Sequence, residues 1–203
     1  MLFIEQKFNI PALQGISAKT MEEHLKLYAG YVKHANLVLE KIAELKKDAN
    51  PSTPLGAGNA YALGEVMRRF GFEFNGMRNH EVYFKSFEGG AKPLSESVLR
   101  AAITERWGSF EVWLAEFKSI ALTRGIGWAM LYWDPASKQL LNAWVDEQHL
   151  GQLQNCALIL GLDMWEHSFV FDYQPSGKKN YVEDFFANVN WSVIEKNLSD
   201  ATK

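Results

Sequence analysis

Apolar residues recur at steps of three or four through the first part of the chain, and from Met21 to Leu45 they fall on one face of a helix. Thr20 followed by Glu23 has the spacing of a capping box, so we expect this helix to begin at Thr20. Residues 1–19 contain a proline and a glycine, and we expect them to form an extended arm that leads into the helix.

A second helical pattern runs from about Ala60 to Phe87, and we expect it to break near Gly71. Residues 50–57, with the sequence NPSTPLGA, have the composition of a loop between the two helices. Two long helices joined by a short loop pack against each other in opposite directions. The first part of the chain therefore predicts an antiparallel helical hairpin.

The second half of the chain alternates between short helical and short extended patterns, after a linker at residues 88–95. The expected helices lie at 99–110, 110–121, 151–156 and 181–186. The expected strands lie at 125–133, at 139–145 and in a third segment that ends at Asp163. These patterns predict an α+β fold, with an N-terminal arm and helical hairpin over 1–90 and a small α/β domain containing a three-stranded antiparallel sheet over 91–203.

Composition narrows the class of protein. The chain has 203 residues, of which 47% are hydrophobic, so it can bury a sizeable core. A formal net charge of -3 provides no basic field for nucleic acid, and no apolar run has the length of a membrane span. The single cysteine, Cys156, excludes an internal disulfide, and the N-terminal residues lack the pattern of a signal peptide. We therefore predict a cytoplasmic protein.

The stretch LILGLDMWEH, residues 158–167, carries the strongest chemical signal. Asp163 ends the apolar run, and a buried carboxylate needs a cationic or hydrogen-bonding partner. His167 lies four residues further on and can aim a nitrogen at the same point as the aspartate oxygen, which is the outline of a metal site. The alternative is an aspartate that caps the next turn.

Two histidines on the predicted hairpin extend this signal. His24 and His80, taken singly, are each typical of a hydrogen-bonded core histidine. Taken together with Asp163 and His167, they complete a set of three imidazoles and one carboxylate, with one position left for solvent.

The chain resembles the iron/manganese superoxide dismutase family over most of its length. Residues 163–167, AspMetTrpGluHis, are similar to the family signature Asp-x-Trp-Glu-His, and further motifs follow in the family's order at 31–36, 79–80, 127–129 and 188–191. The resemblance implies a superoxide dismutase that converts two superoxide ions to dioxygen and hydrogen peroxide by redox cycling of one manganese or iron ion. The implied ligands are His24, His80, Asp163 and His167.

The resemblance also implies a set of residues around the metal. Gln148 would be the outer-sphere amide, and Gly76 stands where manganese-type members carry glycine, so manganese is slightly favoured. Tyr31 would be the gateway tyrosine. It follows His24 by seven residues, whereas the family has eight, so Tyr28 is an alternative for part of that role.

Three further residues have implied roles. Trp128 and Trp165 would form apolar walls, and Glu166 would reach the metal-binding histidine of a second subunit, which implies a homodimer. Val170 occupies a position where the family carries an interface tyrosine.

Superoxide is an anion, and one hypothesis is that a lysine near the site steers it toward the metal. The three candidates are Lys26, Lys178 and Lys179.

Two other functions remain open at this point. The same donor set suits zinc and a hydrolytic reaction, although no second carboxylate base is evident. The chain could also be a family-derived metal-binding or structural protein with altered or lost dismutase activity. All four ligand positions are filled, which favours the dismutase.

Overall fold

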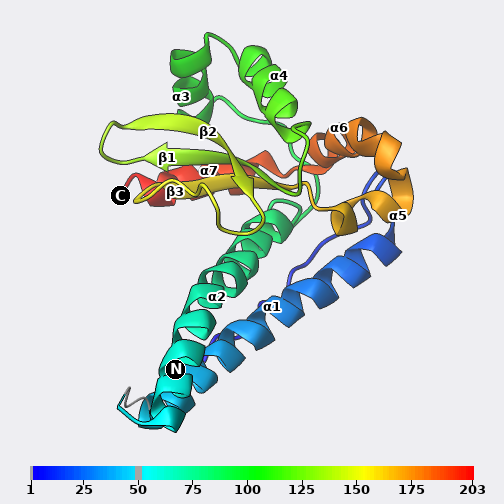
Figure 1. Cartoon of the computed structure of the whole chain (residues 1–203). Helices are drawn as coiled ribbons and strands as arrows, with labels where there is room; N and C mark the ends of the chain where they lie inside the picture. Colours follow the sequence, from blue (N-terminus) through cyan, green and yellow to red (C-terminus); the bar gives the residue numbers. More distant parts are fainter. Residues whose placement is uncertain (1, 49–51) are drawn as a thin grey trace.

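A projecting helical hairpin joined to a compact part with a small sheet makes up the molecule (Figure 1). The computed structural model describes residues 2–48 and 52–203. The hairpin consists of α1, Ala18–Leu45, and α2, Pro54–Lys85. The predicted α+β class, with a helical hairpin followed by a three-stranded antiparallel sheet, is confirmed. We propose that the domain boundary lies at residues 90–91, between α2 and the next helix.

The start of α1 differs from the prediction. The N-cap is Ser17 rather than Thr20, because the Ser17 side chain accepts a hydrogen bond from the Thr20 backbone N–H. The Thr20 hydroxyl instead donates to Asp172 Oδ2 at 2.7 Å. A contact with a residue from the far end of the chain therefore replaces the local capping box.

The start and continuity of α2 also differ from the prediction. The helix begins at Pro54, where proline is well tolerated, and the Thr53 side chain accepts from the Gly56 backbone N–H at 3.0 Å. It then continues through Gly71 without a break. Residues 54–57 of the expected loop are thus helical, and residues 49–51 lie outside the described part of the chain.

The two hairpin helices bury large aromatic side chains between them. Tyr28 of α1 and Phe84 of α2 are both fully buried, and Phe8 of the N-terminal arm packs against both rings. The arm is also held by Asn36, whose side chain exchanges two hydrogen bonds with the backbone of Phe3, at 2.8 and 2.9 Å. The arm and the hairpin therefore share one core.

The sheet has the order β2-β1-β3 and is antiparallel throughout. Its strands are β1, Gly127–Asp134, β2, Gln139–Asp146, and β3, Ala157–Asp163. In this register Trp128, near the start of β1, lies opposite Asp163 at the end of β3. The pairing therefore brings the Trp128 indole and the buried Asp163 carboxylate to the same end of the sheet.

Helices surround this sheet (Figure 1). The first two after the hairpin are α3, Val98–Trp107, and α4, Phe110–Ala121, close to the predicted positions. The last two are α6, Lys178–Asn188, and α7, Trp191–Ala201. Both α2 of the hairpin and α7 contact β3, so these two helices cover the strand that carries Asp163.

Two predictions for the second half are wrong. Residues 151–156 form turns rather than a helix, because Gly151 and Asn155 have positive φ angles of 92° and 61°. Helix α7 was not expected from the pattern, although Asn190 caps its N-terminus by accepting from the Ser192 backbone N–H.

Among the described residues, no helix is both long and apolar enough to cross a membrane.

Candidate metal centre

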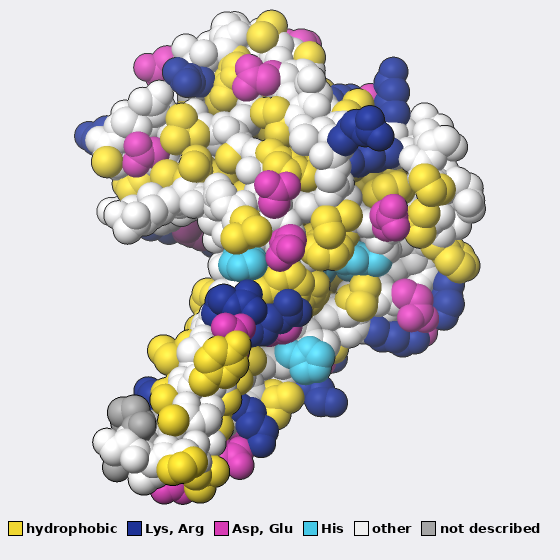
Figure 2. All heavy atoms as spheres, in the orientation of Figure 1, with side chains coloured by type: hydrophobic (Ala, Val, Ile, Leu, Met, Phe, Trp, Pro, Cys, Tyr) yellow, Lys and Arg dark blue, Asp and Glu magenta, His cyan; other side chains and the backbone are white. Residues whose placement is uncertain are grey.

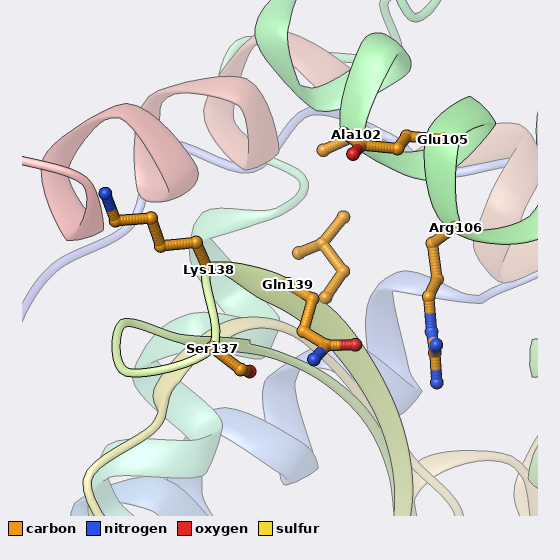
Figure 3. Close-up of a pocket in the computed structure, with 7 residues that line it drawn as sticks. Ala102, Glu105, Arg106, Ser137, Lys138 and Gln139 are labelled. Atoms are coloured by element: carbon orange, nitrogen blue, oxygen red, sulfur yellow. The ribbon is translucent and has the colours of Figure 1, made fainter.

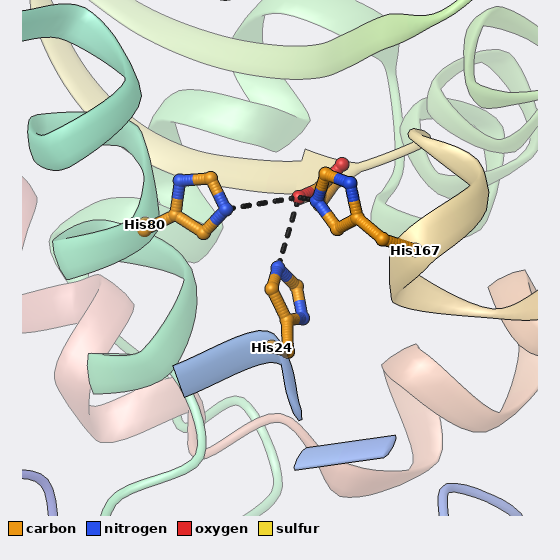
Figure 4. A group of neighbouring side chains, drawn as sticks. His24, His80 and His167 are labelled. Carbon is orange, nitrogen blue, oxygen red and sulfur yellow. Dashed lines mark hydrogen bonds and ion pairs between the residues drawn. The ribbon is translucent and has the colours of Figure 1, made fainter. Parts of the chain in front are cut away.

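Four side chains from separate elements converge at the end of β3. His24 comes from α1, His80 from α2, and His167 from a short 3-10 helix, Glu166–Ser168, that follows Asp163. One donor atom of each residue lies within 4.8 Å of the donor atoms of the others. Figure 4 shows the three imidazoles approaching one point from different sides.

The geometry centres on one carboxylate oxygen. Asp163 Oδ2 lies 3.1 Å from His24 Nε2, 3.2 Å from His167 Nε2 and 3.4 Å from His80 Nε2. The side chains of His24, His80 and Asp163 are fully buried, whereas that of His167 is 22% exposed. Three nitrogens thus surround one oxygen in a site closed to water on most sides.

The hydrogen bonds of His80 leave one of its two ring nitrogens without a partner. Its Nδ1 lies 2.6 Å from the Gly76 carbonyl and must donate to it, so in the neutral ring Nε2 carries a lone pair. That Nε2 is buried and has no hydrogen-bond partner among the described residues. A lone pair that faces a carboxylate oxygen is unfavourable unless a cation lies between them. The donor set of three imidazoles and one carboxylate therefore fits a metal ion of the iron, manganese or zinc type.

Burial sets the protonation of these groups. It lowers the pKa of His80 to about 3, and the neighbouring His24 adds to this shift. Burial also lowers the pKa of His24, which the nearby Asp163 only partly opposes. Burial would raise the pKa of Asp163, but His167 and His24 together hold it below its usual range. Neutral imidazoles and an ionised carboxylate are the forms that bind metal.

Backbone and hydroxyl groups hold the aspartate in place. Asp163 Oδ1 accepts from the Trp165 backbone N–H at 2.8 Å. Its carbonyl accepts from the hydroxyls of Ser168 and Tyr181, at 3.0 and 2.9 Å. The sequence does not indicate these contacts of Ser168 and Tyr181, because neither residue belongs to a motif with Asp163. Their role arises from the turn after β3 and from the packing of α6.

Gln148 links two other predicted residues beside the cluster. Its Oε1 accepts from Trp128 Nε1 at 2.9 Å, and its Nε2 donates to the Tyr31 hydroxyl at 3.0 Å. The glutamine is fully buried, and Asn79 Nδ2 donates to its backbone carbonyl at 2.9 Å. The structure therefore joins Trp128, Gln148 and Tyr31 in one hydrogen-bonded chain.

Tyr31 also explains the glycine at position 76. A Cβ atom at Gly76 would lie 2.5 Å from Cδ1 of the Tyr31 ring, a distance that no side chain can occupy without displacing that ring. The ring of Tyr31 lies 5.0 Å from that of His80, measured between centroids. The absence of a side chain at Gly76 thus allows Tyr31 to reach the site.

The alternative gateway residue, Tyr28, points elsewhere. Its hydroxyl accepts from the Gln6 backbone N–H at 2.9 Å and donates to Glu81 Oε1 at 3.2 Å. Helix α1 is α-helical from Ala18 to Leu45. An uninterrupted helix in which Tyr31 follows His24 by seven positions therefore still brings the Tyr31 hydroxyl to Gln148.

The two remaining predicted residues lie on the turn after β3. The Trp165 ring stacks beside His167 at a centroid distance of 5.7 Å, and its Nε1 donates to the Glu147 carbonyl. Glu166 is exposed to solvent, and among the described residues it makes no side-chain hydrogen bond.

A separate groove of about 300 Å³ between α3 and the β1–β2 turn shares no residue with the cluster (Figure 3).

Known proteins resemble this chain over nearly its whole length. A family model described as iron/manganese superoxide dismutases, C-terminal domain, matches residues 95–197. An iron superoxide dismutase of Pyrobaculum aerophilum is 31% identical over 193 residues, which cover 92% of this chain and 85% of that protein. A manganese superoxide dismutase of Halobacterium salinarum is 36% identical, covering 85% and 81%. A Mn/Fe superoxide dismutase of Propionibacterium freudenreichii is 34% identical, covering 92% and 90%.

The lowered pKa values of His24 and His80 predict acid-sensitive folding of the metal-free protein. Below about pH 6.5 the unfolded chain takes up protons on both histidines, whereas burial hinders their protonation in the folded chain, so stability falls as the pH falls. Each histidine that is protonated only in the unfolded chain contributes a slope of up to about 1.4 kcal/mol per pH unit. Urea unfolding at several pH values, followed by tryptophan fluorescence, measures it. The variant His80→Phe should show about half the slope, and a flat profile in the parent chain would contradict the prediction.

Proposed function

The chain belongs to the iron/manganese superoxide dismutase family, and we propose that His24, His80, Asp163 and His167 are the ligands of the metal ion on which its activity depends. As an enzyme of this family it converts two superoxide ions to dioxygen and hydrogen peroxide. The observation that carries the ligand assignment is the buried, unpartnered Nε2 of His80, which faces Asp163 Oδ2 at 3.4 Å.

An ion of manganese or iron supplies one-electron chemistry when bound, since either metal is stable in the 2+ and 3+ states. The protein provides three imidazoles, which bind a metal in the neutral form, and one ionised carboxylate, so its ligands carry a single negative charge. The fully buried walls around them, including Trp128, exclude bulk water. The turn after β3 and the two hairpin helices fix the ligands in position.

Tyr31 and Gln148 are the residues that we propose to manage protons, since formation of peroxide consumes two of them. Burial raises the pKa of the Tyr31 hydroxyl, and the charge of Asp163 raises it further. The hydroxyl therefore stays protonated near neutral pH. Because Gln148 Nε2 donates to the Tyr31 oxygen, the Tyr31 proton is free to be donated elsewhere.

The choice of metal is a finer proposal. We infer that manganese is slightly favoured, because the glutamine reaches Tyr31 from the turn between β2 and β3 while position 76 of α2 is a glycine. A glutamine at position 76 would collide with the Tyr31 ring, so in this chain the outer-sphere amide must come from Gln148. The similar proteins are named for iron, for manganese or for both.

We also propose a homodimer in which Glu166 reaches the partner. Ligating histidines commonly donate their second N–H to a carboxylate or a carbonyl. Within the described residues, Nδ1 of His167 has no such acceptor, while the neighbouring Glu166 is exposed. In a two-fold assembly Glu166 of the partner subunit would accept from His167, and the reverse contact would form by symmetry.

A reducing compartment such as the cytoplasm is our proposal for the location. The chain contains a single cysteine, Cys156, which is a free thiol with half-buried exposure. It has no second cysteine with which to form an internal disulfide.

Metal content and activity test the function together. We expect the purified protein to carry up to one manganese or iron ion per chain, and superoxide consumption to scale with that metal across preparations. Plasma mass spectrometry and a superoxide assay on the same sample measure both. Zinc alone, with no activity after reconstitution with manganese or iron, would contradict the proposal.

Replacing each tyrosine with phenylalanine tests the gateway assignment. Tyr31→Phe removes the hydroxyl that Gln148 contacts, and we expect turnover to fall by about tenfold or more. Tyr28→Phe removes only contacts with Gln6 and Glu81, so it should lower stability by about 1 kcal/mol and leave turnover within about twofold. Stopped-flow kinetics on metal-matched samples separate the two. Equal loss from both variants, or from neither, would overturn the assignment.

Charge removal at Glu166 tests the dimer. Glu166→Gln should weaken self-association and lower metal affinity by about tenfold to a hundredfold, whereas Glu105→Gln, an exposed glutamate on α3, should change neither. Sedimentation velocity at micromolar concentration and metal competition measure these effects. A parent chain that is monomeric and fully active at that concentration would exclude the bridging role.

A further inference from the structure

Two fully buried tyrosines lie behind the metal centre, and neither of them is the gateway residue Tyr31. Tyr83 lies on α2, one helical turn after His80, and Tyr181 lies on α6. Their hydroxyl oxygens are 3.1 Å apart, and the Tyr181 hydroxyl donates to the backbone carbonyl of Asp163 at 2.9 Å. The two phenols therefore link the hairpin to the strand end that carries the carboxylate.

The donors and acceptors in this link can be assigned. A carbonyl oxygen can only accept, so the single Tyr181 hydroxyl proton points toward Asp163. The Tyr83 hydroxyl must then donate to the Tyr181 oxygen. Burial raises the pKa of both hydroxyls, so each keeps its proton near neutral pH. We call this series, from Tyr83 through Tyr181 to the Asp163 carbonyl, the tyrosine chain, and its hydrogen bonds strengthen one another because they point the same way.

Ser168 does not replace Tyr181 as a donor to this carbonyl. Its hydroxyl has one proton and two acceptors within reach, the Trp165 carbonyl at 2.7 Å and the Asp163 carbonyl at 3.0 Å. The shorter distance favours the Trp165 carbonyl. The Asp163 carbonyl therefore depends mainly on Tyr181.

The peptide unit between Asp163 and Met164 is held from both sides. Its carbonyl accepts from Tyr181, and its N–H, which belongs to Met164, donates to the Gly127 carbonyl at 2.8 Å. Rotation of this peptide unit is restricted when both of its polar groups are bonded. The tyrosine chain thus fixes the backbone from which the Asp163 carboxylate projects toward the imidazoles.

The ring of Tyr83 makes a second contact with the ligand set. Its centroid lies 4.9 Å from that of His24, on the other helix of the hairpin. Ligating histidines commonly have an acceptor for their second N–H, yet Nδ1 of His24 is buried without a hydrogen-bond partner among the described residues. Packing against rings, those of Tyr83 and Phe84, therefore orients this imidazole.

We propose that Tyr83 is a positioning residue for the metal centre, whose ring orients His24 and whose hydroxyl, through the tyrosine chain, holds the end of β3 at Asp163. The inference rests on the proposed ligand assignment. A site whose ligands are held in place before the metal arrives loses less conformational freedom on binding, so it binds more tightly. The tyrosine chain therefore raises metal affinity without contacting the ion.

Removing either hydroxyl leaves the charged surface around the site unchanged. Figure 2 shows Lys, Arg and histidine side chains at the surface where the hairpin meets the rest of the molecule. Because Tyr83 and Tyr181 are fully buried, Tyr83→Phe and Tyr181→Phe alter no exposed charge, and both variants keep their rings. Tyr132, on β1, is a matched control, since it is 3% exposed and its hydroxyl donates to Met130 Sδ rather than to the tyrosine chain.

The experiment uses Co²⁺ as the probe, because its visible absorption bands respond to the geometry of the ligands. The Co²⁺ dissociation constant, measured by competition with a chelator, should rise by about tenfold in Tyr181→Phe and by about three- to fivefold in Tyr83→Phe. Both variants should also shift the absorption bands. Tyr132→Phe should leave the spectrum unchanged and the dissociation constant within about twofold of the parent value.

The double variant tests whether the two hydroxyls act in series. Tyr83→Phe combined with Tyr181→Phe should resemble Tyr181→Phe alone, because both hydroxyls act through one carbonyl. Losses of affinity that multiply in the double variant would overturn the inference. An equal loss in Tyr132→Phe and Tyr83→Phe would overturn it as well, since any buried hydroxyl would then have the same effect.

The outcomes separate this inference from the proposed function. A parent chain that binds Co²⁺, with the same affinity and spectrum in Tyr83→Phe, would overturn the positioning role and keep the ligand assignment. A parent chain that binds none of cobalt, manganese and iron would overturn both. Urea unfolding of the metal-free variants shows that each one is folded before the titration.

Discussion

One buried carboxylate oxygen organises this molecule. Asp163 Oδ2 has three imidazole nitrogens within 3.4 Å, contributed by two helices and a turn that are far apart in the sequence. Burial keeps His24 and His80 neutral, so their contacts with the carboxylate do not supply the full charge that a buried anion requires. The metal-free fold therefore carries a cost that a cation removes, and metal binding and folding are coupled through this group.

Close packing of the hairpin connects Tyr31 and Gln148 to the cluster around Asp163. Because position 76 is a glycine, the Tyr31 ring can lie against α2 and its hydroxyl can reach Gln148. Gln148 in turn is held by Trp128, which pairs with Asp163 across the sheet. The cluster around Asp163 and the hydrogen-bonded chain of Trp128, Gln148 and Tyr31 thus depend on the same contact between the hairpin and the sheet, and a shift of α1 relative to α2 would disturb both.

The overall charge of the chain does not attract its substrate. The chain is negative overall, while its substrate is an anion. Arg69 lies over the Phe72 ring, and its Nε donates to the nearly buried Glu73, so the two charges form an ion pair at the surface of α2. A surface ion pair of this kind contributes little to stability.

The sequence by itself determined the α+β class, the hairpin, the strand that ends at Asp163 and the four residues that converge there, because periodicity and a short motif depend only on neighbouring residues. The tertiary structure decided which tyrosine meets Gln148, why Ser17 rather than Thr20 caps α1, and that Phe72 packs beside Tyr31. Each of these depends on a contact between elements distant in the chain, as when Asp172 takes the Thr20 hydroxyl. Local patterns specify faces and ends of elements, whereas the packing of those faces selects the partners.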